Sequence, residues 1–76
     1  MKLKLTRHFQ DMISWRGINL DHVKATMREP DEKTDAYDGA IKVKKEVDGK
    51  TIEVIYCKEN FRDRKEEYLI ITAYYL

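Results

Sequence analysis

The sequence predicts an α+β fold in which two helices cover one face of a largely antiparallel sheet. Three observations predict it. Lys2–Leu5 alternates charged and apolar residues with the period of a half-buried strand. Two stretches with helical spacing of apolar residues follow that strand. Beyond them, two Asp-Gly pairs each separate alternating segments, which is a strong short-range signal for β-hairpins. The 76 residues have room for one domain, residues 1–76.

The first helix is predicted at Arg7–Arg16. Thr6 can cap its N-terminus through the side-chain oxygen. Gly17 follows the last helical residue, where a left-handed backbone conformation commonly ends a helix. The face expected to be buried carries Phe9, Met12, Ile13 and the aliphatic stem of Arg16.

The second helix is predicted to begin directly after Asn19, which can serve as its N-cap, and to end before Pro30. Ile18 and Val23 have the spacing of a hydrophobic staple around that cap. The short connection predicts a two-helix hairpin. The buried stripe is expected to consist of Leu20, Val23 and Met27. His22 is expected to face solvent.

The rest of the chain predicts an antiparallel β-meander. Its strands are expected at Lys33–Tyr37, Ala40–Val47, Lys50–Cys57 and Glu67–Tyr75, with a charged loop from Lys58 to Lys65 before the last one. The last strand is apolar on both faces, which is typical of a strand in the middle of a sheet.

The Asp48-Gly49 turn predicts a register. It pairs Val47 with Lys50, Lys45 with Ile52, Val43 with Val54 and Ile41 with Tyr56, on an apolar face that should pack on the helices. The opposite face, called the open face below, should carry Lys42, Lys44, Glu46, Glu53, Ile55 and Cys57, with Lys2 and Lys4 beside them. A basic stripe on this face is expected, weakened where Lys44 opposes Glu53.

Composition excludes some classes of protein. Charged residues make up 38% of the chain but its net charge is only +1, which argues against a strongly basic nucleic-acid binder and leaves room for a local basic patch. A single cysteine, Cys57, fits a reducing compartment. The N-terminus lacks the apolar core of a signal peptide, and the longest apolar run, Tyr68–Leu76, is too short to span a bilayer. We therefore expect a cytoplasmic protein without membrane association.

His8 and Arg16 are the first candidates for chemistry. A histidine can act as general acid or base near neutral pH, and an arginine can hold a phosphate by two hydrogen bonds. On one helix they would lie about 12 Å apart along the axis and differ by about 80° in direction, so a common site needs a substrate or strand that bridges them. The structural alternative has His8 bonded to backbone and Arg16 packed over the sheet edge beside the negative end of the helix dipole.

Other candidates follow from strand and loop positions. Tyr74 and Tyr75 must point to opposite faces, so one of them lies on the open face, where it can stack on a base or donate a proton. Cations crowd around Phe61 in the charged loop, a combination that suits an RNA backbone or an acidic partner, unless the loop is simply solvated. Two histidines and one cysteine match no metal-ligand spacing, so neither a metal nor a cofactor is predicted.

Several features carry a resemblance to known proteins: Thr6-Arg7-His8, Arg16-Gly17-Ile18, Val23, Glu29-Pro30-Asp31, an Asp-Gly hairpin after them and the C-terminal run from Leu69 to Tyr74. Together they resemble a family of small bacterial and archaeal proteins, a domain of unknown function, whose members typically read T-x-H-A-x-x-R-M-x-x-R-G-I and end in V-x-T-A-Y. The resemblance covers nearly the whole chain. That family in turn resembles the RelE/ParE/BrnT superfamily of toxin–antitoxin proteins.

The resemblance implies a toxin that cleaves mRNA without a metal, often on the ribosome, and that an antitoxin protein neutralises. The positions that match catalytic roles are His8 and Arg16, with Tyr74 as a weaker candidate. The residues expected to bind RNA are Lys2, Lys4, Lys42, Lys44, Arg62, Arg64 and Lys65. Met12 departs from the pattern, because the family often has Arg there, and Phe9 replaces a small residue; loss of that cation weakens a phosphate site.

Two alternatives remain open at this point. The chain can be a non-enzymatic interaction module that forms a homodimer or holds a partner through Ile55 and a tyrosine of the open face. It can also be a degenerate toxin that keeps antitoxin binding without cleavage. If the chain is a ribonuclease, we expect a basic groove bordered by His8 and Arg16. If it is an interaction module, we expect a contiguous exposed apolar patch.

Overall fold

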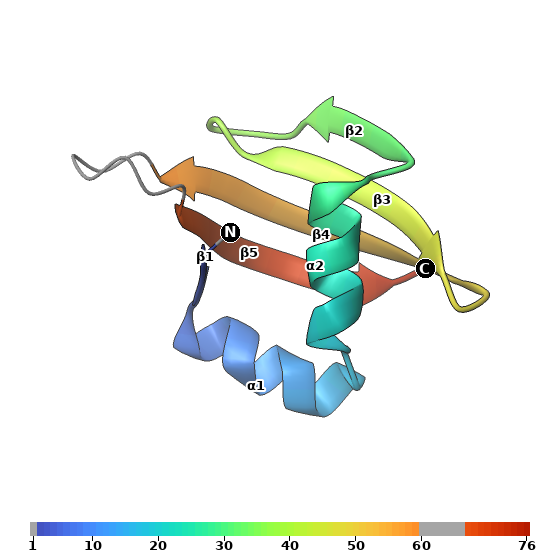
Figure 1. Ribbon diagram of the computed structural model, residues 1–76. Coiled ribbons are helices and arrows are strands. Elements are labelled where there is room, and N and C mark those ends of the chain that lie inside the picture. The colour runs from blue at the N-terminus through green and yellow to red at the C-terminus, as the bar shows by residue number, and fades with distance from the viewer. Residues whose placement is uncertain (1, 60–66) are drawn as a thin grey trace.

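The computed structural model describes residues 2–59 and 67–76, and only the backbone at residues 2 and 59. Its elements are β1 (Lys2–Leu5), α1 (Arg7–Arg16), α2 (Leu20–Arg28), β2 (Glu32–Asp35), β3 (Ile41–Val47), β4 (Lys50–Glu59) and β5 (Glu67–Tyr75). The strands form one sheet in the order β1-β5-β4-β3-β2 (Figure 1). The α+β fold predicted from the sequence is confirmed, with the last strand inside the sheet.

The sheet is mixed. β1 runs parallel to β5, and the other three pairs of neighbours are antiparallel. Between β3 and β4 the register is the one that the Asp48-Gly49 turn predicts, including Val43 opposite Val54 and Lys44 opposite Glu53. Asp48 and Gly49 both have positive φ, 50° and 77°, as a tight two-residue hairpin turn requires.

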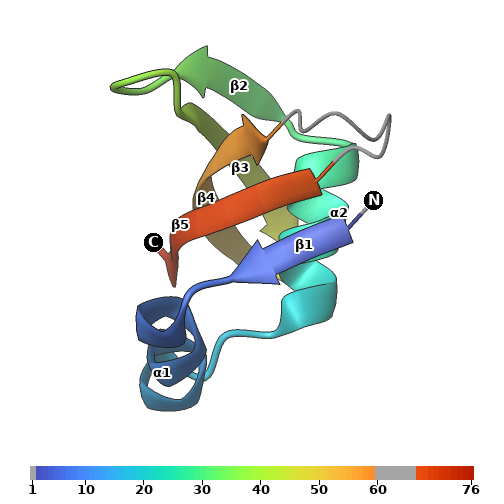
Figure 2. The ribbon, with the colours of Figure 1, turned by 90° about the vertical axis from the view of Figure 1, so that its left-hand side faces the viewer.

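Helix α1 begins and ends as its sequence predicts. The side chain of Thr6 accepts a hydrogen bond from the Phe9 amide at 3.0 Å, and Gly17 adopts the left-handed conformation with φ of 61°. β1 pairs with β5 only as far as Ile70. Beyond that point α1 follows the edge of β5 and covers it (Figure 2). The remaining edge of β5 is therefore protected by a helix in place of a strand.

Helix α2 packs on the face of the sheet, across β3 and β4. Asn19 caps it by accepting a hydrogen bond from the Asp21 amide at 2.9 Å, and Pro30 follows the terminal residue Glu29. α1 and α2 run crosswise in both views, so the connection between them makes a corner and the helices do not lie antiparallel as a tight hairpin would (Figures 1 and 2). Each helix packs mainly on the sheet because one covers an edge and the other a face.

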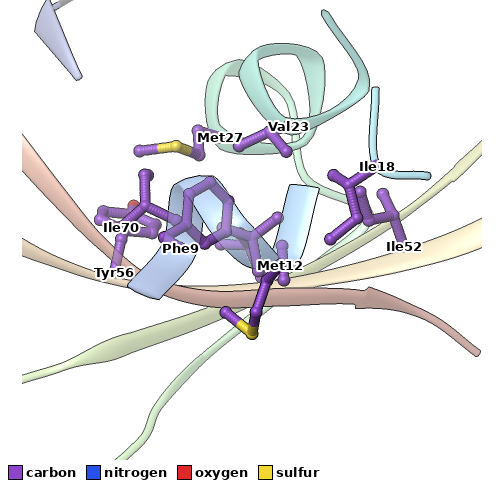
Figure 3. Packing of buried hydrophobic residues seen from close by; sticks show 11 residues of the cluster. Phe9, Met12, Ile18, Val23, Met27, Ile52, Tyr56 and Ile70 are labelled. Carbon is purple, nitrogen blue, oxygen red and sulfur yellow. The ribbon is translucent and has the colours of Figure 1, made fainter. Parts of the chain in front are cut away.

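The hydrophobic core lies between the two helices and the face of the sheet toward α2, called the helix face below (Figure 3). Its buried members are Phe9, Met12, Ile18, Val23, Met27, Val43, Ile52, Val54, Tyr56, Ile70 and Ala73. The predicted buried stripe of α2 is confirmed for Val23 and Met27, while Leu20 is half-buried. Thr26 is also fully buried, and its hydroxyl donates to the His22 carbonyl at 2.7 Å, so it brings no unsatisfied polar group into the core.

Some predicted strand limits are wrong. β2 begins at Glu32, one residue earlier than predicted, because the Asp31 amide already donates to the Lys44 carbonyl at 2.8 Å, and it ends at Asp35 rather than Tyr37. Asp35 pairs with Ile41, so residues 36–40 connect the two strands, whereas a two-residue Asp38-Gly39 turn would have paired Tyr37 with Ala40. β4 reaches Glu59, two residues further than predicted, since its end pairs with the start of β5. Long-range pairing, not local sequence, sets both limits.

The core position of Tyr56 predicts how stability depends on alkaline pH. Burial raises the pKa of the Tyr56 hydroxyl above its ordinary value of 10.0, while the Lys58 charge acts in the opposite direction. The unfolded chain therefore loses this proton at lower pH than the folded chain, and stability present below about pH 10 is lost as the pH rises toward the raised pKa. Denaturant unfolding between about pH 9 and about pH 11 should show a smaller loss of stability in Tyr56→Phe than in wild type. Tyr37→Phe, at an exposed tyrosine, should lose as much as wild type; equal losses in both variants would contradict the prediction.

Candidate functional site

The open face is built by alternate residues of three strands. One row across it is Lys42, Ile55 and Thr72, and the next is Lys44, Glu53 and Tyr74. Tyr74 therefore lies on the open face, whereas Tyr75 pairs with Ile52 and packs against the core on the helix face. The strand register thus decides which of the two tyrosines faces the open side, which the alternation of residues alone did not.

The lysines of this face are largely neutralised. Lys44 Nζ lies 3.6 Å from Glu53 Oε1 and 4.0 Å from Glu32 Oε2, and Lys4 Nζ lies 3.1 Å from Glu67 Oε2. Glu53 is only 4% exposed, although it lies on the face of the sheet away from α2. The expected basic stripe is thus a mixed-charge surface. Within residues 2–59 and 67–76, Lys42 is a lysine of this face without an ion pair.

Arg16 lies at the border of the open face. Its Nη1 donates to the Ala73 carbonyl oxygen at 3.3 Å, on the edge of β5 that α1 covers. That carbonyl directly precedes Tyr74, so the guanidinium lies beside the residue that turns onto the open face. In the described part of the chain Arg16 has no carboxylate partner, and its side chain is exposed. A guanidinium has five N–H groups, so this one keeps donors for a ligand.

His8 does not share a site with Arg16. It is exposed in the first turn of α1, about two turns before Arg16. Met12 lies between them along the helix, is 4% exposed, and accepts a weak hydrogen bond from the Thr72 hydroxyl at a distance of 3.8 Å from its sulfur. The helix therefore presents a buried thioether where the resembling family often has a cation. The structure does not assemble His8, Arg16 and Tyr74 into one acid–base centre.

Part of the predicted RNA-binding set lies outside the described residues: Arg62, Arg64, Lys65 and the side chain of Lys2. In the part of the chain that is described, no group of three or more histidine, cysteine, aspartate or glutamate residues could hold a metal ion. No helix there is long and apolar enough to cross a membrane.

Hollows on the open face are small. One of about 100 Å³ lies between β2 and β3, lined by Glu32, Thr34, Lys42 and Lys44. Another of about 220 Å³ lies beside it, lined by Asp31, Glu32, Lys44, Lys45, Glu46 and Thr51. Both are smaller than the roughly 300 Å³ at which small-molecule sites usually begin. A chain lying along the surface fits this face better than a compact ligand.

A cluster around His22 was not predicted from the sequence. Its Nδ1 lies 3.0 Å from the Tyr75 hydroxyl and its Nε2 lies 3.0 Å from Asp48 Oδ2. The backbone N–H of Asn19 also donates to the Tyr75 hydroxyl, at 3.2 Å. The His22 side chain is only 18% exposed, so the expectation that it faces solvent is wrong. We call Asp48, His22 and Tyr75 the tyrosine triad.

The tyrosine triad joins three elements that are distant in sequence. α2 supplies His22, the β3–β4 turn supplies Asp48, and the end of β5 supplies Tyr75. Tyr75 reaches the helix face because a register irregularity between Ile55 and Tyr56 changes the pairing of β4 with β5. No local sequence signal predicts that irregularity. The Asp-Gly pair does predict from sequence alone that Asp48 lies at the tip of a hairpin.

Comparisons of the chain with protein-family models, curated proteins and solved structures found no match.

The buried carboxylate of the open face gives a testable consequence. Lys44→Met leaves Glu53 without its cation, and a buried polar group deprived of its partner costs about 1–3 kcal/mol of stability. The double variant Lys44→Met/Glu53→Gln should recover most of that loss, because the charge is removed with its partner. Urea unfolding measures both. Lys42→Met, on the same face and strand, should change stability by no more than about 0.5 kcal/mol; a loss equal to that of Lys44→Met would refute the role given to the ion pair.

Proposed function

We propose that this protein is toxin-like and acts by binding single-stranded RNA across the open face of its sheet. The observation that carries the proposal is the position of Arg16, held on the edge of β5 beside Tyr74 by its bond to the Ala73 carbonyl. An exposed guanidinium bonded to the carbonyl that precedes an aromatic residue of the open face brings together the two kinds of group that single-stranded RNA can contact, a cation for a phosphate and a ring for a base.

Lys42 extends this surface across the sheet. It lies on β3, and the row from Lys42 through Ile55 to Thr72 crosses β4 to reach β5. Neighbouring strands lie about 4.8 Å apart, so roughly 10 Å separates β3 from β5. An RNA backbone that crosses the strands can contact Lys42 at one side and Arg16 at the other, with a base against Tyr74 between them.

Cleavage is not required by this proposal. Hydrolysis without a metal needs an acid or base at the 2′-hydroxyl or at the leaving oxygen. His8 is about two helical turns from Arg16 and Met12 contributes no charge, so the geometry supports RNA binding better than strand scission. Among the interpretations that the resemblance offers, the binding of RNA by a toxin without strong nuclease activity fits these positions best. An antitoxin protein is the partner that we propose for it in the cell.

A second candidate function is self-association through the same face. Ile55, Cys57 and Leu69 lie next to one another on the open face, and each is half-buried although this face points away from α2. The paired lysines and glutamates around them place both signs of charge on one surface, so two copies related by a twofold axis can match charges. This observation favours a homodimer in which the open face is covered by a second copy.

RNA binding can be measured by fluorescence anisotropy with a labelled single-stranded RNA at several salt concentrations. Arg16→Ala and Lys42→Ala should each weaken binding and lower the slope of log affinity against log salt by about 0.7, because each removes one phosphate contact. Tyr74→Leu should weaken binding about fivefold or more, the loss of one stacked base, with little change in the salt slope. Lys24→Ala, an exposed cation on α2 away from this face, is the matched control and should bind as wild type.

Loss of affinity in Lys24→Ala equal to that in Arg16→Ala would mean nonspecific attraction and would overturn the RNA-binding site. Sedimentation of the wild type without RNA separates the second candidate. A dimer that Ile55→Asp converts to monomer, together with no measurable RNA binding, would replace the proposal by self-association. Induced expression of wild type and His8→Ala, with cellular RNA followed in parallel, tests separately whether cleavage occurs.

A further inference from the structure

We propose that Tyr75 is a nucleophile that His22 activates as general base and Asp48 orients, and that it accepts an acyl group from an activated carboxylic ester. The proposal is independent of RNA binding, because Tyr75 packs on the helix face and Tyr74 on the open face. A nucleophile within hydrogen-bonding distance of a base, itself oriented by a third group, is the arrangement by which hydroxyl nucleophiles are activated.

The hydrogen bonds of the tyrosine triad have a direction. An ionised Asp48 can only accept, so the Nε2 of His22 that faces it at 3.0 Å carries a hydrogen. In the neutral ring Nδ1 is then an acceptor, and it lies 3.0 Å from the Tyr75 hydroxyl. The Asn19 N–H already donates to that oxygen, which leaves the phenolic proton to point at Nδ1. With this tautomer, the Tyr75 hydroxyl donates to Nδ1 of His22.

Two further groups contact Tyr75. Asn19 caps α2, and its N–H donates to the oxygen from the end of the helix where the dipole is positive. Lys50 Nζ lies 5.3 Å from the centre of the Tyr75 ring, close enough for a cation–π interaction. One hydrogen-bond donor therefore contacts the Tyr75 oxygen, and one cation lies over its ring.

A purely structural role explains the cluster less well. Asp48 is 85% exposed in its contact with His22, and an ion pair so open to solvent contributes little to stability. What Asp48 does fix is the tautomer and orientation of a ring that is 18% exposed. No other described tyrosine has this arrangement: Tyr37 is 57% exposed without a histidine partner, and Tyr74 pairs across the strands with Glu53.

The proposed step is an acyl transfer. The Tyr75 oxygen attacks the ester carbonyl carbon and forms a new C–O bond while its proton moves to Nδ1 of His22. The carbonyl electron pair moves to oxygen and returns as the bond to the leaving alcohol breaks. His22 then gives its proton to the leaving oxygen, so the products are an acyl-tyrosine and one alcohol. No oxidant, metal or further reactant takes part.

The experiment treats the full-length folded protein with p-nitrophenyl acetate and locates acetyl groups by peptide mass spectrometry with fragmentation. Hydroxylamine distinguishes acetyl-tyrosine, which it cleaves, from acetyl-lysine.

Tyr75 should be acetylated at least about tenfold faster than Tyr37, although Tyr37 is the more exposed, because positioned bases accelerate such steps by about 100-fold or more. His22→Gln, which keeps a hydrogen-bonding side chain but removes the base, should abolish the difference. Asp48→Asn, at a residue too exposed to disturb folding, should slow acetylation of Tyr75 and leave that of Tyr37 unchanged.

If Tyr37 in the folded wild type is acetylated as fast as Tyr75 or faster, the rates reflect solvent exposure alone, and the proposal is overturned. An unchanged rate at Tyr75 in a folded His22→Gln variant would overturn it as well. Circular dichroism shows whether that variant folds. If it does not, Asp48→Asn decides: a slower reaction at Tyr75 alone supports a relay through His22, and an equal rate refutes it.

Discussion

The pairing of β5 on both of its edges is the constraint on which the rest of this fold depends. On one side β5 is hydrogen-bonded to β4 along nearly its whole length. On the other side it pairs with β1 as far as Ile70 and then borders α1, whose Arg16 donates to the Ala73 carbonyl. A buried strand end must have its backbone polar groups satisfied. The chain achieves this by leading a short first strand directly into a helix along the same edge.

That arrangement decides which surfaces remain for function. Because α1 occupies an edge and α2 a face, no described element covers the other face of the sheet. This face then has to be compatible with water, and it is so through cross-strand charge pairs such as Lys44 with Glu53. The same pairs reduce its positive potential. The RNA binding that we propose for this face would therefore depend on the cations that lack carboxylate partners in the described chain, Arg16 and Lys42, and not on total charge.

The two adjacent tyrosines of β5 show how neighbouring residues acquire different chemistry. Tyr74 and Tyr75 differ by one position in a strand, so they point to opposite faces. One lies beside the cross-strand partner Glu53 on the open face. The other reaches a histidine of α2 and an aspartate of a distant turn. The irregularity between Ile55 and Tyr56 decides which tyrosine faces which side, and it arises in the pairing of two strands, not in either strand alone.

The sequence by itself determined the elements that local interactions create. The Thr6 and Asn19 caps, the Gly17 helix end, the Asp48-Gly49 turn and its register all follow from contacts between residues close in the chain, and each is confirmed. Tertiary structure alone decided the parallel pairing of β1, the crosswise packing of the helices and the limits of β2 and β4, because these depend on which distant backbone groups bond together. The candidate sites divide in the same way. Sequence identified Arg16 and placed a tyrosine on the open face. The environment of His22 required the long-range register that brings Tyr75 and Asp48 to it, and no periodicity within a helix encodes that register.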